Sequence, residues 1–193
     1  MAEQLFGRHG IEGVSLRQIN VAAGLANKSA VHYHFGDRAE LVRAIWRYRL
    51  PQLTARRMTL IHQAGERGTL NDPHTLLSIV VQPIHEIVDE TGYRCFAAFS
   101  RHAIRASIAA ELPDSILVED PSLGIALGEV VKLGAKLRPA LTRDVAWYRV
   151  RYAISAFFDM EFERGHAPPL GMPRSEADFF ADGIRMMVAM CFR

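Results

Sequence analysis

The stretch from residue 15 to residue 41 limits the fold more than any other part of this chain, because it predicts two short helices joined by a tight turn. Ser15 is a good N-cap, and Gln18 follows three residues later, where a capping box places Glu or Gln. The first helix should therefore begin at Ser15. Gly24 should end it, since glycine tolerates the left-handed backbone that a helix C-terminus needs. The second short helix is predicted over residues 27–34.

A third helix should follow directly. Gly36 and Asp37 break the second helix, and Asp37 can cap a longer helix that begins at Arg38. A helix, a glycine turn and a second short helix form a helix-turn-helix, which lays its second helix in the major groove of DNA. The predicted second helix carries no acidic side chain and presents Asn27, Lys28, Ser29, His32, Tyr33 and His34. This surface suits phosphates and base edges, and the alternative is an ordinary helical hairpin with a solvated polar face.

A set of residues at fixed spacing connects this region to a known family. They are Leu5-Phe6, Gly10, Ser15-Leu16-Arg17, Ile19, Ala22-Ala23-Gly24, Tyr33-His34-Phe35, Gly36-Asp37-Arg38 and Leu41. The pattern resembles the DNA-binding domain of the tetracycline-repressor (TetR) family of bacterial transcriptional regulators. One departure is Asn20, which stands where the family usually has a small apolar residue. Two others are an extra residue between Gly24 and Phe35 and the short segment before Leu5, where the family's first helix usually starts earlier.

The position of each residue and the resemblance together give seven candidates for DNA contact: Ser15, Arg17, Lys28, Ser29, His32, Tyr33 and Arg38. Lys28 and Ser29 lie near the start of the predicted recognition helix, where they can reach base edges. The resemblance implies phosphate or thymine-methyl contacts for His32 and Tyr33, and a backbone contact for Arg38. The amides at the start of the preceding helix, which include Arg17, can hold a phosphate. Phe35 is expected to pack inside the domain.

The rest of the chain shows helical patterns and no convincing strand pattern. Helix starts are predicted at Asp72-Pro73, Asp120-Pro121, Thr142 and Ser175, where capping residues precede apolar periodicity. Pro51 should kink or divide its helix, and Pro83 should kink its own.

These patterns predict an all-α fold in two domains. Residues 1–48 form a three-helix helix-turn-helix DNA-binding domain, and residues 49–193 form a larger helical domain. The resemblance implies that the larger domain binds an effector and dimerises.

The distribution of charge agrees with a small basic DNA-contacting domain joined to a nearly neutral remainder of the chain. The net charge of +2 is uneven, since residues 1–50 hold seven basic and four acidic side chains. Cys95 and Cys191 are isolated in sequence, which favours a reducing compartment and no metal site. There is no signal peptide and no apolar run near ~20 residues. We expect a cytoplasmic protein with no cofactor, no metal and no membrane contact.

The last two predicted helices are apolar on most sides, which requires burial on most sides. The resemblance implies a homodimer through a four-helix bundle of these helices, and the alternative is the core of a monomer. A two-fold dimer spaces its recognition helices ~34–36 Å apart and needs a palindromic operator.

The family's larger domain also binds a small-molecule effector. Candidate pocket residues are Phe96, Phe99, His102 and Trp147, for which plain core packing is the alternative.

The sequence therefore predicts a sequence-specific DNA-binding transcriptional regulator, acting as a repressor that a small-molecule effector releases from its operator. The alternative is a helical protein-interaction module without DNA-binding activity. Catalysis is not expected: Ser100, His102 and Asp114 can be imagined as a triad, but no nucleophile-elbow, phosphate-loop or metal motif accompanies them.

Overall fold

The computed structural model describes residues 1–27, 29–109, 120–166, 168–173 and 175–193. Within these ranges the chain is helical, and the all-α prediction is confirmed. The helices are α1 (Ala2–His9), α2 (Leu16–Ala22), α3 (Ala30–Phe35), α4 (Arg38–Glu66), α5 (Pro73–His85), α6 (Cys95–Ala109), α8 (Pro121–Leu137), α9 (Arg143–His166) and α10 (Glu176–Phe192).

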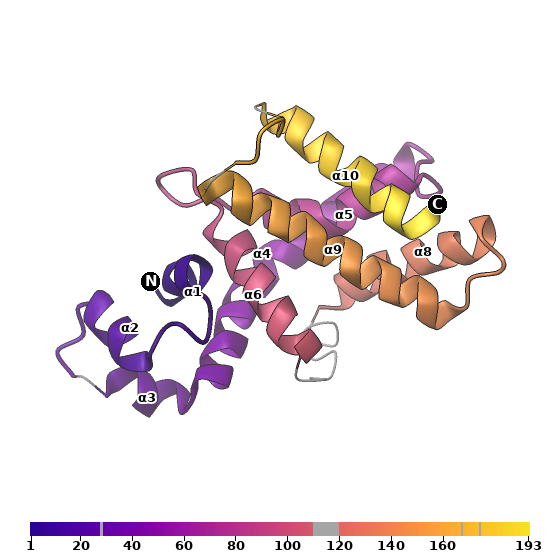
Figure 1. Ribbon diagram of the computed structural model, residues 1–193. Coiled ribbons are helices and arrows are strands. Elements are labelled where there is room, and N and C mark those ends of the chain that lie inside the picture. Colours follow the sequence, from indigo (N-terminus) through magenta and orange to yellow (C-terminus); the bar gives the residue numbers. More distant parts are fainter. Residues whose placement is uncertain (28, 110–119, 167, 174) are drawn as a thin grey trace.

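Figure 1 shows α1, α2 and α3 gathered at one end of the molecule, with α4 running from them into the remaining helices. We call α1, α2, α3 and residues 38–48 of α4 the head, and the rest of the chain the body. In the described ranges, no helix combines the length and the apolar character that crossing a bilayer requires.

Side-chain caps set where most helices begin, as the sequence predicts. Ser15 Oγ accepts a hydrogen bond from the Gln18 amide at 3.2 Å, and Gln18 Oε1 accepts one from the Ser15 amide at 2.8 Å. This is the predicted capping box. Thr142 Oγ1 accepts from the Val145 amide at 3.3 Å at the start of α9. At the starts of α4, α5, α8 and α10, the N-cap side chain likewise accepts a hydrogen bond from the amide three residues later. These N-cap residues are Asp37, Asp72, Asp120 and Ser175.

The predicted recognition helix is wrong in its bounds. α3 begins at Ala30 rather than at residue 27 and ends at Phe35. Asn27 forms a turn instead: its Oδ1 accepts from the Ser29 amide at 2.9 Å, and its carbonyl accepts from the Ala30 amide at 3.1 Å. Asn side chains favour such local bonds over helical ones. Ser29 therefore occupies the N-cap position.

Neither proline divides its helix. Pro51 lies inside α4, which runs without interruption from Arg38 to Glu66. Pro51 is exposed on the outer side of this helix. Pro83 lies inside α5, two residues before the helix ends at His85.

An aromatic cluster joins the head to the body. The ring of Trp46 on α4 lies 5.0 Å from that of Phe96 and 5.9 Å from that of Phe99, both on α6. Phe6 on α1 stacks on Phe99 at 6.3 Å. The backbones also approach closely, because a Cβ at Gly7 would lie only 2.7 Å from the Cys95 carbonyl oxygen. This packing seats α1 directly against α6.

A buried ion pair ties the long helix α4 to α8. The guanidinium of Arg57 contacts the carboxylate of Asp120, and the two side chains are 1% and 2% exposed. Arg57 Nη1 also donates to Ser122 Oγ at 3.1 Å, and Asp120 caps α8 through the Leu123 amide at 3.1 Å. Burial lowers the pKa of Arg57, and the Asp120 carboxylate opposes that shift.

The neighbouring arginines of α4 give a matched test of this pair. Arg57→Ala should lower the free energy of unfolding by about 3–5 kcal/mol, because it leaves the Asp120 charge buried without its partner. Arg56→Ala removes the partly exposed pair with Glu86 and should cost under about 1 kcal/mol. Urea denaturation at one protein concentration measures both. Equal losses for the two variants would contradict this account.

Candidate nucleic-acid interface

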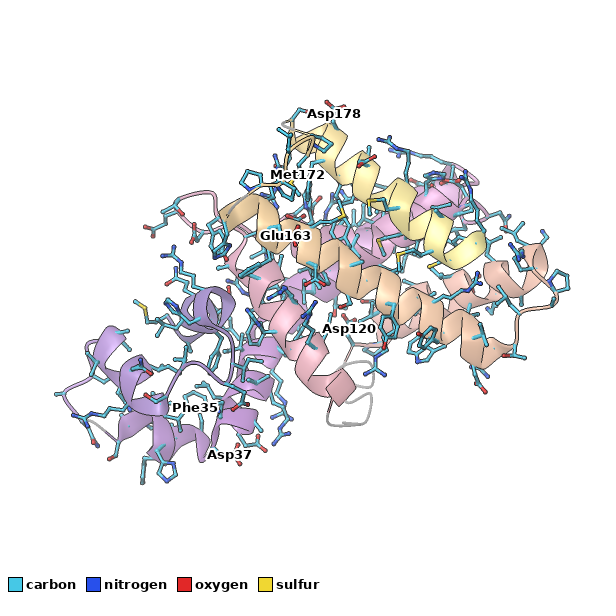
Figure 2. The ribbon with its side chains drawn as sticks, viewed as in Figure 1. Phe35, Asp37, Asp120, Glu163, Met172 and Asp178 are labelled. Carbon is cyan, nitrogen blue, oxygen red and sulfur yellow. The ribbon has the colours of Figure 1, made fainter. Side chains whose placement is uncertain are left out.

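The described candidates for DNA contact all lie at the head. Ser15 and Arg17 stand at the start of α2, Ser29 caps α3, His32 and Tyr33 lie on α3, and Arg38 begins α4. All of them are exposed except Arg38, which is half-buried. Lys28, the seventh candidate, lies outside the described residues. Figure 2 labels Phe35 and Asp37 at this end of the molecule, far from Asp178 on α10.

The outer surface of α3 is aromatic and polar. Tyr33 is 84% exposed, and its ring meets the imidazole of His34 edge-on at 5.4 Å. Val31 turns the other way and is 5% exposed in the core of the head. Phe35, which the sequence predicts to pack inside, is 37% exposed. α3 therefore presents hydroxyl, imidazole and aromatic groups outward, with one apolar anchor inward.

Asn20 holds α2 and α3 together. It is 2% exposed, its Nδ2 donates to the Leu16 carbonyl at 3.1 Å, and its Oδ1 accepts from the Val31 amide at 3.0 Å. The backbone carbonyl of Asn20 also accepts from the Leu25 amide at 3.1 Å in the turn. Sequence reasoning noticed Asn20 only as a departure from the family pattern. The sequence signal that could have revealed its role is a polar residue at a helix position where apolar residues are usual, because such a residue is buried and needs hydrogen-bond partners.

Acidic groups neutralise two arginines at the edge of the head. Arg38 pairs with Glu12, whose side chain is 85% exposed, whereas that of Arg38 is 34% exposed. Arg43 pairs with Glu40, and this hydrogen bond is the main cause of the lowered pKa of Glu40. The carboxylate of Glu12 thus competes with any phosphate for the guanidinium of Arg38.

A polar network anchors α1 beside the aromatic cluster. Arg49 on α4 binds Glu3 on α1 through two hydrogen bonds of 2.8 and 2.9 Å. Cys95 Sγ at the start of α6 donates to the same carboxylate at 3.1 Å. The Glu3 carboxylate raises the pKa of Arg49, and burial raises the pKa of Cys95 to about 12. Cys95 is therefore a protonated structural donor at neutral pH rather than a reactive thiolate.

The four residues predicted to line an effector pocket are not gathered in one place. Phe96 and Phe99 are fully buried in the aromatic cluster at the head. His102 is half-buried, its ring lies 5.7 Å from that of Phe162, and burial lowers its pKa. Trp147 lies near the other end of α9, about 22 Å along the helix from Phe162. The structure thus brings Phe96 and Phe99 together and leaves Trp147 apart.

Two surface hollows lie elsewhere. One of about 580 Å³ opens between α1, α4 and the segment before α6, and one of about 320 Å³ lies between the end of α4 and the start of α5. None of the four predicted pocket residues lines either hollow. Among the described residues, no group of three or more His, Cys, Asp or Glu side chains is arranged to hold a metal ion.

The sequence of the head matches a known family. Residues 1–45 match the family described as "Bacterial regulatory proteins, tetR family". The head belongs to the tetR family. This family consists of DNA-binding transcriptional regulators, so α2 and α3 correspond to the helix-turn-helix of such a regulator. No curated protein matches the chain.

The ion pair between Arg38 and Glu12 gives a test of the interface. Glu12→Gln should raise the affinity for duplex DNA about two- to fivefold, because it frees Arg38 for a phosphate and removes a negative charge near the DNA. Glu66→Gln, an equal charge change at the far end of α4, should leave affinity unchanged. Fluorescence-anisotropy titration at fixed salt measures both. Equal affinity of Glu12→Gln and the wild type would show that Arg38 does not contact DNA.

Proposed function

We propose that this protein is a homodimeric repressor that binds a palindromic operator and is released from it by a small-molecule effector. The proposal rests on one observation above all: α3 projects an exposed polar and aromatic surface from a head of the tetR family. We divide the chain into a DNA-binding domain at residues 1–48 and an effector-binding and dimerisation domain at residues 49–193. α4 spans this boundary as one helix, so it can carry a change in the body to the head. Operator binding places its site of action in the cytoplasm.

The proposed DNA contacts follow from the positions of the exposed side chains. Ser29 makes no capping bond with its hydroxyl, which therefore stays available to a base edge. His32 and Tyr33 lie on the exposed surface of α3, where they can reach phosphates and thymine methyl groups. Ser15 and Arg17 border the start of α2, where free amides and the helix dipole attract a phosphate.

The proposed dimer uses an apolar face of α9 and α10, which pack side by side (Figure 1). Val145, Tyr148 and Tyr152 recur at helical spacing on α9 and are 42%, 58% and 42% exposed. Met186 and Met190 lie one turn apart on α10 and are 45% and 38% exposed. Contiguous exposed apolar groups of this kind mark protein interfaces. Pairing this face about a two-fold axis produces a four-helix bundle and presents two recognition helices to DNA.

An effector can release the protein from DNA only if it binds one arrangement of the two heads more tightly than the other. The contacts through which the body holds the head include the aromatic cluster and the bonds from Glu3 to Arg49 and Cys95. A ligand that shifts α6 relative to α4 must strain these contacts. The head, which includes α1, then moves with α6 rather than independently of the body.

Titrations with duplexes selected by the wild-type protein from a random pool test the proposed contacts. Ser29→Ala and Lys28→Ala should weaken binding to the selected sequence about five- to tenfold, with little effect on random duplex, because they remove base contacts. Arg17→Ala should weaken both and reduce the slope of log affinity against log salt by about one. Arg185→Ala, on α10, is the control and should change neither. Unchanged titrations for Ser29→Ala, Lys28→Ala and Arg17→Ala would contradict the assigned interface.

Sedimentation equilibrium tests the dimer. Tyr152→Glu and Met186→Glu should each produce monomers, because a buried unpaired carboxylate is costly at an apolar interface. The monomers should bind the selected palindrome at least about tenfold more weakly, since only one half-site is engaged at a time. Met58→Glu places the same charge on an exposed methionine of α4 and should remain dimeric. Dimers that persist in both α9 and α10 variants would exclude this interface.

A further inference from the structure

Asn20 is a buried polar side chain of the head, whose buried apolar residues include Ile19 and Val31. Both ends of its amide are hydrogen-bonded, to the Leu16 carbonyl within α2 and to the Val31 amide of α3. The first bond fixes the orientation of the side chain. The second crosses from one helix of the motif to the other. An apolar side chain could fill the same volume, but it could not make this connection.

The bond to Val31 meets a requirement of α3. The first amides of any helix lack intrahelical partners, and a side chain at the N-cap usually accepts from one of them. Ser29 holds that position, with φ −111° and ψ 5°, but its side chain makes no capping bond. Asn20 Oδ1 supplies the bond to the second residue of α3 from a different helix. The recognition helix is thus capped by α2 across the turn.

We propose that Asn20 is a positioning residue for DNA recognition, which fixes the start and the direction of α3 relative to α2. This inference rests on the proposed function. Phosphate contacts at the start of α2 and base contacts from α3 are made together only if the two helices keep one angle. Because Asn20 provides the cap, the hydroxyl of Ser29 is also left for DNA. Without Asn20, the Val31 amide recruits Ser29 or loses its partner, and either change disturbs the base contacts.

Two substitutions separate the hydrogen bond from the volume of the side chain. Asn20→Leu keeps the volume and removes both bonds, whereas Asn20→Asp keeps the acceptor that faces the Val31 amide. Affinity is measured for a duplex selected by the wild-type protein and for random duplex, each over a range of salt concentrations. Hydrogen exchange of the Val31 amide, followed by NMR in the absence of DNA, reports the cap itself.

We expect Asn20→Leu to bind the selected duplex about tenfold more weakly, to bind random duplex within about twofold of the wild type, and to keep the same salt slope. Its Val31 amide should exchange about tenfold faster. Asn20→Asp should retain slow exchange and most of the sequence preference. A purely structural role would weaken both kinds of binding together. The control is Ile79→Val in α5, which reduces stability in the body and should leave the ratio of the two affinities unchanged.

Three results would overturn the proposal. The first is an Asn20→Leu variant with wild-type sequence preference. The second is loss of preference in Asn20→Asp while its Val31 amide stays protected, because preference would then not depend on the cap. The third is a wild-type protein that prefers no sequence, which overturns the proposed function and this role together. The first two leave the proposed function standing, so the failures are distinguishable.

Discussion

The packing of α1 against α6 is the contact on which the rest of the structure depends. Phe6 stacks on Phe99, Trp46 meets both aromatic residues of α6, and Gly7 lets the two backbones approach. The three-helix head is small, and a domain of that size buries little apolar surface by itself. Sharing a core with α6 supplies the missing burial. It also fixes the orientation of α3 relative to the body.

Polar bonds at this contact give it a defined geometry that apolar packing alone lacks. Glu3 receives Arg49 from α4 and Cys95 from α6, so one carboxylate joins three helices. Farther along α4, the buried pair of Arg57 and Asp120 fixes the same helix to α8. α4 is thereby held at two interior points, Arg49 and Arg57, by charged groups that cannot slide without losing their partners. A helix held in this way moves as a unit, which suits a connection between a ligand-binding body and a DNA-binding head.

Local features of the chain were predicted well because they depend on neighbouring residues. The capping box of Ser15, the Asp37 cap and the Asp-Pro starts of α5 and α8 all form as expected. The start of α3 was misplaced, because local turn bonds of Asn27 compete with the helix and the deciding cap comes from Asn20, eleven positions before the Val31 amide that it accepts from. Pro51 was expected to kink or divide α4, and the helix continues through it without a division. The grouping of Phe96 and Phe99 with Phe6 and Trp46 depends on tertiary packing, and no spacing along the chain reveals it.

The central claim is that the head reads a DNA sequence through a pair of recognition helices. Selection of duplexes from a random pool by the purified protein, at near-physiological salt, tests this most directly. The account predicts enrichment of a palindrome whose half-sites lie about one helical turn apart, or a multiple of it, to match a two-fold dimer. A dimer that is intact in solution and enriches no sequence would contradict it.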